Sequence, residues 1–487
     1  MKTTPVPLEN THLARVNHKN RVVDKNNAVT AIEGALRECL GMLEPEESAR
    51  QIIPGRPAIL PATVLWAGLL VCIIRGFSHQ IELWRMLTLG GIWNFPVVDV
   101  TPMAIYNRLR LTSSKQMQLL FDQVTEAIQE HFPQSLFPVM ASFRGQTIEL
   151  ASFATSVVAI DQSKLDAVLR KLKVLRGLPK GESALMPGSL NCLFDIRQQQ
   201  WKKVIFSPQP HQNERTEAYS LLEGLKKGAL VLADLGYFGF AWFDTLTQDG
   251  HFYVSRMKEK VSYSVEHTFY QGGSSAIKVI DQLVYLGAYR ADRAAHPVRL
   301  VQLSITNGAS VTTWRYLTNI LDPSLLPVWQ IVELYRRRWD IEMVFNLLKT
   351  HLGLHLLYSG VQNTILQQVY ATFIIAQVVL SMRNEIARKA NVDVREVSMA
   401  LLVRWAPRLA AMGRDPIAEF VDKGHKLGFI RPFRGKSYEL PEINEEEYVL
   451  PERLPPKRKP RYGPPKPGEP KPSVRKTRSS QIPSLQP

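Results

Sequence analysis

The sequence predicts a mixed α/β protein in which a sheet-containing core carries a β-rich insertion and is flanked by helical N- and C-terminal regions. Short strand-like runs alternate with helical runs from residue 141 to residue 257, as they do in α/β folds. Alternating apolar and polar residues fill positions 258–320, which favours an inserted sheet. Apolar residues at helical spacing dominate both ends of the folded part, so the core is expected between two helical regions.

Composition limits what this chain can be. With 487 residues, 45% of them hydrophobic and 21% charged, it is long enough for two or three domains with their own cores. Cys39, Cys72 and Cys192 are far apart and lack CxxC spacing, which favours a reducing compartment and argues against a structural zinc site. The N-terminal segment lacks the apolar core of a signal peptide, so we expect a cytoplasmic protein.

The net charge of +16 is unevenly distributed. Residues 451–487 hold 10 Lys and Arg against 2 Glu, together with 11 prolines, so this stretch carries half of the excess charge. We expect residues 431–487 to form an extended, disordered basic arm, because such a composition cannot bury a core. A polyanionic partner is predicted, and nucleic acid is favoured over a membrane because the chain has no basic amphipathic anchor or lipidation motif.

Residues 1–140 predict a helical N-terminal region. Apolar positions recur at helical spacing from about Asn27 to Glu130, and a capped helix is expected to begin near Thr101. The apolar run Ala58–Ile74 is broken by a proline and is short for a membrane span, which favours a buried helix.

Residues 141–257 predict the first part of the sheet core. A strand is expected to end at Asp161, and a hairpin to turn near Gln198–Gln200. A helix over ERTEAYSLLEGLKKG precedes a buried strand that ends at Asp234, and a helix over AWFDTLTQDG precedes a strand over HFYVSRM. The expected order is β, β-hairpin, α, β, α, β.

Residues 258–320 form the predicted β-rich insertion, and residues 321–360 a core helix running from about Val328 to Leu352. A helical C-terminal region is expected over residues 361–430. Its apolar run is interrupted by Gln367, Gln368 and Gln377, which favours a soluble core or dimer helix over a membrane span.

The core helix carries four polar residues at regular spacing: Tyr335, Arg338, Glu342 and Lys349. At about 100° per residue, these side chains fall within a stripe roughly 60° wide on an α-helix. A phenol, two cations and an acid would then face one place. An ordinary solvated face with an Arg–Glu pair is the alternative for this pattern.

Two further acids come directly after apolar runs that predict strands, Asp161 after VVAI and Asp234 after LVLA. Carboxylates at the carboxyl ends of buried strands lie where open α/β folds place ligands. With Glu342 they would supply three oxygen donors, which suit Mg²⁺, and two such ions could support an in-line phosphoryl displacement. A turn or N-cap role is the alternative for either aspartate alone.

These residues resemble those of bacterial insertion-sequence transposases of the DDE class, in the group with the signature Tyr-x2-Arg-x3-Glu-x6-Lys and a ribonuclease H-like core. Tyr335, Arg338, Glu342 and Lys349 match that signature without a gap. The family's Asp-x-Gly-Tyr/Phe box is met by Asp234, Gly236 and Tyr237, and its first acid by Asp161. The resemblance covers roughly residues 140–360, including a β-rich insertion before the third acid.

The resemblance implies that Asp161, Asp234 and Glu342 are catalytic and bind Mg²⁺, for which Mn²⁺ can substitute. It implies that Tyr335, Arg338 and Lys349 contact the transposon end, and that Trp314 stacks on a flipped base, as in relatives that cut through a DNA hairpin. The alternative for Trp314 is a core tryptophan on an insert strand.

The implied function is a cut-and-paste transposase that hydrolyses the phosphodiester at inverted-repeat ends and joins them to target DNA. The implied partners are double-stranded DNA and a second copy of the chain in the active complex, with residues 1–140 binding the DNA end. We expect a bacterial, nucleoid-associated protein without a membrane partner. A nuclease that cuts without joining, and a DNA-binding protein without turnover, are the alternatives. His351 and His355 are spaced for zinc but lack a third ligand, and zinc is not predicted.

Overall fold

The structure is a computed structural model that describes residues 60–131, 140–165, 188–209, 214–287, 292–433 and 440–463, apart from positions 78, 93–94, 144–145 and 309. The chain divides into two compact units. Unit 1 comprises residues 1–137, 162–212 and 340–435, and unit 2 comprises residues 138–161, 213–339 and 436–487. Each unit thus combines three separate stretches of chain, whereas the sequence suggested consecutive domains. Pairing between strands distant in sequence produces this difference.

Unit 1 is mainly helical. Its helices are α3 (Ala62–Ile74), α4 (Ile81–Leu89), α5 (Pro102–Leu111), α6 (Ser114–His131), α10 (Trp339–Asn346, from its second residue), the π-helix η8 (Leu347–His351), α11 (Gln362–Ala390), the short η9 (Val394–Glu396), α12 (Met399–Ala411) and α13 (Pro416–Leu427). The predicted cap of α5 is confirmed, because the Thr101 hydroxyl accepts from the Ala104 amide at 3.2 Å. The predicted helical segment before residue 60 lies outside the described residues.

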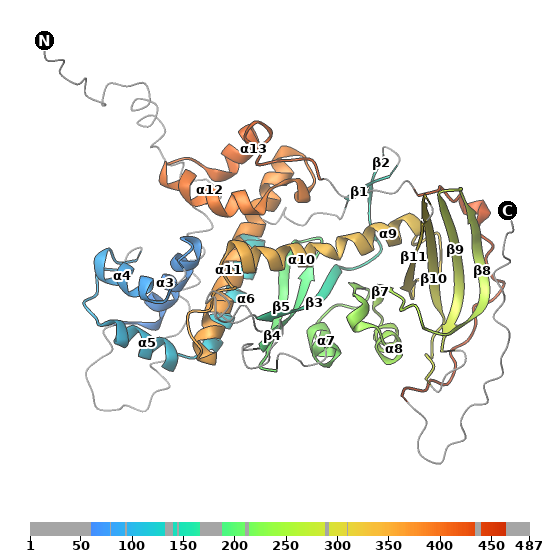
Figure 1. Ribbon diagram of the computed structural model, residues 1–487, viewed down its shortest axis with the longest axis horizontal. Coiled ribbons are helices and arrows are strands. Elements are labelled where there is room, and N and C mark those ends of the chain that lie inside the picture. Colours follow the sequence, from blue (N-terminus) through green and yellow to red (C-terminus); the bar gives the residue numbers. More distant parts are fainter. Residues whose placement is uncertain are drawn as a thin grey trace, which may run out of the picture. The chain divides into compact units, whose positions relative to one another are not determined.

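Helix α11 is the core of unit 1 and is drawn in orange in Figure 1. It is long and apolar enough to cross a membrane, yet 89% of its most apolar window is buried inside the protein. Its polar side chains are bound internally: Gln377 Nε2 donates to Thr125 Oγ1 at 2.8 Å and to the Trp201 carbonyl at 3.1 Å. Gln367 likewise donates to the Leu109 carbonyl at 2.7 Å. These bonds identify α11 as a core helix of the protein.

The sheet includes β3 (Val157–Leu165), whose residues are divided between the two units. In unit 1 its order is β5 (Gln200–Ser207), β4 (Gly188–Asp195) and β3, and β4 pairs with β5 as the predicted hairpin. In unit 2 the order is β3, β6 (Leu230–Leu232), β7 (Phe252–Arg256), β11 (Ser310–Thr318), β10 (Val298–Asn307), β9 (Ile277–Leu286) and β8 (Tyr263–Gly273). Strands β3, β6 and β7 are parallel and the others antiparallel, so the predicted mixed α/β class is confirmed.

The predicted β-rich insertion is the four-stranded antiparallel part of this sheet, β8 to β11 (Figure 1). It is continuous with the core sheet, because β11 pairs with β7 through Tyr316 and Arg256 and the next two pairs. Unit 2 also holds the small hairpin β1 (Met140–Phe143) and β2 (Gln146–Glu149), the helices α7 (Glu214–Leu222), α8 (Phe240–Gln248) and α9 (Val328–Arg337), and the short helices η7 (Leu235–Tyr237) and η10 (Glu445–Glu447).

The C-terminal segment departs from the predicted arm. Residues 440–463 are extended, as expected, but they are hydrogen-bonded to unit 2 and are not disordered. The Val449 amide donates to the Phe269 carbonyl at 2.9 Å, and the Arg458 amide to that of Ala295 at 2.9 Å. The Tyr462 hydroxyl donates to Asp244 Oδ2 at 2.7 Å. We call residues 440–463 the strap; residues 464–487 lie outside the described part.

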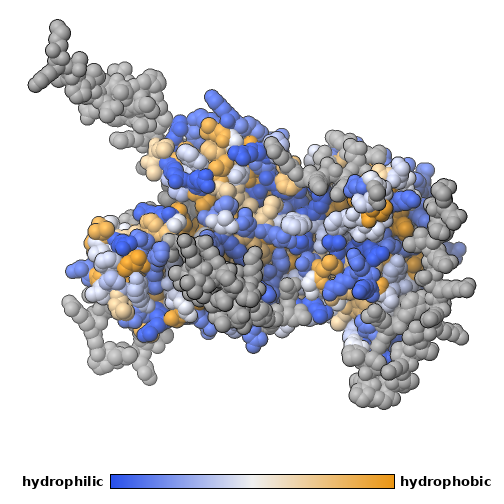
Figure 2. All heavy atoms as spheres, viewed as in Figure 1, coloured by the Kyte–Doolittle hydropathy of each residue, from blue (hydrophilic) through white to orange (hydrophobic). Residues whose placement is uncertain are grey.

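The hydrophilic surface agrees with the chain's content of charged residues, which is 21%. On the face drawn in Figure 2, hydrophilic residues cover most of the described surface and apolar side chains appear in small separate groups. Single exposed apolar residues such as Leu89 and Met103 are ordinary on a folded protein.

Candidate active site

Asp161 on β3 and Asp234 just after β6 lie at the same level in unit 2, where these two strands are parallel neighbours. The last registered pair between β3 and β6 is Ala159 with Leu232, and each aspartate comes two residues later. Parallel strands are about 4.8 Å apart, and residues two apart in extended chain point to the same side. Both aspartates are half-buried. The sheet therefore brings two of the predicted acids together at the carboxyl end of β6.

The local structures of these two acids differ. Asp234 follows its strand as predicted and caps η7, where Oδ1 accepts from the Gly236 amide at 2.7 Å. The prediction that the other strand ends at Asp161 is wrong, because β3 continues to Leu165. The continuation pairs with β4, and Gln162 Nε2 donates to Asn191 Oδ1 at 3.0 Å. Asp161 is consequently held in mid-strand.

The predicted single core helix is divided into three parts. Helix α9 ends at Arg337, α10 begins at Trp339, and η8 replaces the last α-helical turns. In η8 the Leu352 amide donates to the Leu347 carbonyl at 2.9 Å, a π-type bond. A π turn holds more residues than an α turn, so Lys349 does not keep the α-helical phase of the other signature residues. The stripe of four is therefore not continuous.

Tyr335 and Arg338 are buried in unit 2, with 7% and 5% of their surface exposed. Burial raises the pKa of the Tyr335 phenol, while Arg338 and Arg256 lower it and Asp234 raises it. The phenol is thus close enough to one candidate acid and two arginines to feel their charges. It stays protonated at neutral pH and can donate a hydrogen bond. The alternative of a solvated ion-paired face does not hold for these two residues.

Trp314 is half-buried on β11, and its ring carries the Arg256 guanidinium 4.4 Å from the ring centroid. A cation over an indole face is a favourable arrangement. Arg256 was not singled out by the sequence, because a single arginine at the end of a strand carries no motif. Its place at the end of β7, beside Trp314 and within electrostatic reach of Tyr335, adds it to the candidate site.

Glu342 and Lys349 belong to unit 1, and both are half-buried. The unit boundary falls between Trp339 and Asp340, inside the signature segment. Asp340 is buried and accepts from Gln199 Nε2 at 3.1 Å, so this segment is tied to the β4–β5 turn of its own unit. Among the residues that the structure describes, no three His, Cys, Asp or Glu side chains gather closely enough to hold a metal ion.

The two arginines that precede Arg338 have different surroundings. Arg337 is only 3% exposed. Arg336 Nη1 contacts Glu333 Oε2 at 2.6 Å in a half-exposed pair. The side of α9 that carries Arg337 is buried. The spacing of Arg337 from Arg338 in the sequence could not reveal this burial.

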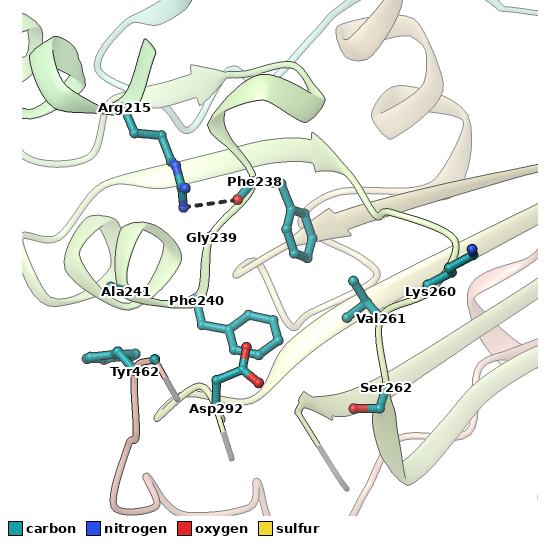
Figure 3. A pocket seen from close by; sticks show the side chains of 11 residues that line it. Arg215, Phe238, Gly239, Phe240, Ala241, Lys260, Val261, Ser262, Asp292 and Tyr462 are labelled. Carbon is teal, nitrogen blue, oxygen red and sulfur yellow. Dashed lines mark hydrogen bonds between the residues drawn. The ribbon is translucent and has the colours of Figure 1, made fainter. Parts of the chain in front are cut away.

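A cavity of about 280 Å³ lies at the start of α8, just after the Asp234 box (Figure 3). Arg215, Lys260 and Asp292 contribute charges of both signs to its wall, and Arg215 Nη1 donates to the Phe238 carbonyl at 3.4 Å. Tyr462 of the strap lines it as well. Neither Asp161 nor Asp234 lines this cavity.

Comparison with known proteins finds a family match over part of the chain. A family model described as the transposase DDE domain matches residues 174–377. That stretch contains Asp234, Trp314 and all four signature residues, and Asp161 lies before it. The chain is thus similar to transposases of the DDE family over the middle of its length.

Relatives of low identity agree. A Sinorhizobium fredii chain assigned as a transposase is 26% identical over 153 residues, which cover 31% of this chain and 41% of the relative. A Geobacillus stearothermophilus chain assigned as the transposase of insertion sequence element IS5377 is 23% identical over 170 residues, 35% of this chain and 43% of the relative. The transposase for insertion sequence element IS231F from Bacillus thuringiensis subsp. israelensis is 24% identical over 232 residues, 38% and 48% of the two chains. This chain spans less than half the length of each.

Among solved structures, the piggyBac transposase synaptic complex with hairpin DNA aligns with 89% of this chain and 90% of that chain. Its TM-score is 0.39 and its identity 10%, a likeness too weak to define the fold.

Proposed function

We propose that this chain is a metal-dependent DNA transposase of the cut-and-paste type. It would hydrolyse the phosphodiester at the ends of its element and transfer the freed 3′ ends into target DNA. The observation that carries the proposal is the level placement of Asp161 and Asp234 on adjacent parallel strands, within a chain whose middle matches the transposase DDE domain.

Asp161, Asp234 and Glu342 are the proposed catalytic acids. All three are carboxylates, whose oxygens are the donors that a hard divalent cation prefers. Mg²⁺, or Mn²⁺ in its place, would supply activation of the attacking oxygen and stabilisation of the leaving oxygen. The chain's own contribution is to hold these carboxylates on a strand, a strand end and a helix.

Tyr335, Arg338 and Lys349 are the proposed contacts to the transposon end, and Arg256 is proposed with them because it lies beside Trp314 and within electrostatic reach of Tyr335. Arginine suits phosphate oxygens because its fork of donors matches them, and the neutral phenol of Tyr335 can donate alongside. The Trp314 ring, stacked on Arg256, is the proposed platform for a flipped base. The same proposal includes the signature subgroup and a ribonuclease H-like core. It also includes double-stranded end and target DNA as partners, a homodimeric active complex, and a nucleoid-associated location in the bacterial cytoplasm.

Substitution of the third acid tests the chemistry. Glu342→Gln keeps the size of the side chain and removes its charge, so end binding should persist while Mg²⁺-dependent strand cleavage is lost. Glu333→Gln is the control, because it makes the same change in α9, where Glu333 pairs with Arg336. Cleavage by Glu342→Gln at the parent's rate would rule out its catalytic role.

The joining step is tested separately with pre-cut ends. A transposase transfers these ends into a target duplex and forms strand-joined products. A nuclease on the same fold would cut uncut ends and join nothing, and a silent DNA-binding protein would do neither.

A further inference from the structure

Unit 1 contains a cationic cavity that the proposed chemistry does not use. Its volume is about 430 Å³, and it lies among the end of α3, the end of η8 and one face of α12. Arg75 follows α3, His351 ends η8, and Arg404 and Arg408 come from α12. None of the described residues that line it is an acid. The wall therefore concentrates positive charge without a built-in counterion.

In the described part of the chain, the Arg75 and Arg408 side chains contact uncharged groups. Arg75 Nη1 lies 3.8 Å from the Met86 sulfur, and Arg408 Nη1 donates to the Arg404 carbonyl. Arg408 also stands 5.8 Å from the centroid of the Trp405 ring. Within the described residues, none of the three forms an ion pair with a carboxylate.

Other arginines of the same unit are neutralised by nearby acids. Arg388 contacts Glu385 at 2.8 Å, Arg414 contacts Glu419 at 3.1 Å, and Arg395 contacts Asp393 at 3.1 Å. The lack of acids around the cavity is thus a local feature and not a general property of the unit.

Helix dipoles account for only part of this arrangement. A cation at a helix C-terminus is favourable, which explains Arg75 after α3 and is consistent with Arg408 in the last turn of α12. Arg404 stands in the middle of α12, where the dipole offers no such reason. Its charge is felt inside the cavity, since the pKa of His351 is lowered by burial and then by Arg404.

Arginines without acids suit a ligand with anionic oxygens, because guanidinium groups bind phosphate in a forked geometry. The cavity volume is within the range of roughly 300–1,000 Å³ typical of ligand sites. Its wall includes Thr350 and His351, which directly follow Lys349 of the signature in η8. A backbone phosphate held here would therefore be bound by the same helical segment that carries Lys349.

We propose that Arg75, Arg404 and Arg408 bind a phosphate group of the DNA backbone in this cavity. The inference rests on the proposed function, because it takes DNA as the source of the phosphate. It assigns a contact to α12, in a region beyond the stretch that matches the transposase domain.

The test is the double variant Arg404→Gln/Arg408→Gln, in which both altered side chains are exposed. Its binding to a duplex carrying the terminal sequence of the element is measured at several salt concentrations. Loss of two cations that face one or two phosphates should weaken binding and reduce the salt slope by about 1–2, at roughly 0.9 per phosphate contact. The double variant Arg388→Gln/Arg414→Gln removes the same charge from paired arginines and should keep the parent's slope.

A slope equal to the parent's in the first variant overturns the inference, as does an equal loss in the control. Calorimetric titration with inorganic phosphate identifies the source: phosphate binding by the parent, with unchanged duplex binding by the variant, would assign the cavity to a free anion instead. Strand cleavage by the parent is measured in parallel. If the parent cleaves DNA and the Arg404→Gln/Arg408→Gln variant keeps the parent's salt slope, the inference alone is refuted. If the parent never cleaves DNA and that variant has a reduced salt slope, the proposed function alone is refuted.

Discussion

At the scale of single residues, the candidate site depends on which charges meet. Sequence spacing predicted that Arg338 and Lys349 share one stripe with Tyr335, and the structure places Arg256, from a strand far away in sequence, near the Tyr335 phenol together with Arg338. Arg256 is also the cation on the Trp314 ring, at 4.4 Å from its centroid. One guanidinium thus links the predicted aromatic platform to the predicted phenol, and its removal should affect DNA binding.

Arg256→Gln should weaken binding of the end duplex and lower the salt slope by about 1, as expected for the loss of one phosphate contact. Arg256→Lys should restore the slope, because it retains the charge and loses only the planar stack. Binding isotherms at several salt concentrations measure both effects. Arg315→Gln is the control. Arg315 follows Trp314 on β11, and consecutive residues of a strand point to opposite faces of the sheet. Its Nε already donates to Gln302 Oε1 at 3.1 Å. Equal slopes for Arg256→Gln and the parent would remove Arg256 from the site.

At the scale of elements, the insertion is locked to the chain that precedes α9 by a buried ion pair. Arg299 on β10 and Asp281 on β9 are both fully buried, with a contact of 2.6 Å between Nη2 and Oδ2. Arg299 Nη1 also donates to the Leu326 carbonyl at 2.6 Å, just before the start of α9. The pair therefore fixes two insert strands against the loop that leads into the helix of Tyr335.

Asp281→Asn should be strongly destabilising, because it leaves the buried charge of Arg299 without its counterion. We expect a loss of about 3–5 kcal/mol in the free energy of unfolding, measured by urea denaturation. Glu82→Gln breaks the half-exposed pair with Arg85 and should cost no more than about 1 kcal/mol. Similar losses in the two variants would contradict the role given to the buried pair.

At the scale of the whole molecule, the chain returns from its C-terminal region to unit 2 through the strap. Asp244 on α8 is 2% exposed and accepts hydrogen bonds from the Ala295 amide, the His296 amide and the Tyr462 hydroxyl. Burial raises the pKa of Tyr462, and its bond to Asp244 raises it further, so the phenol remains a donor. A segment rich in proline and basic residues is thus held by a few specific bonds.

Tyr462→Phe removes one hydrogen bond to a buried carboxylate, a contact worth about 1.5–3 kcal/mol. The end of the strap should open more often, and trypsin should cut after Arg461 about ten-fold faster or more than in the parent. Mass spectrometry of timed digests gives these rates. Leu454→Ala alters an exposed strap side chain and should digest at the parent's rate. Equal digestion of Tyr462→Phe would show that this bond does not hold the strap.

The sequence by itself determined the mixed α/β class, the hairpin near Gln198, the insertion and the cap at Thr101, because each depends on local periodicity or turn chemistry. It also indicated the acids that the proposal uses. Only the tertiary structure decided that Asp161 lies in mid-strand, that the signature segment changes to a π-helix at Leu347, and that Arg256 joins Trp314 and Tyr335. These features depend on pairing and burial between distant residues, which local patterns do not encode.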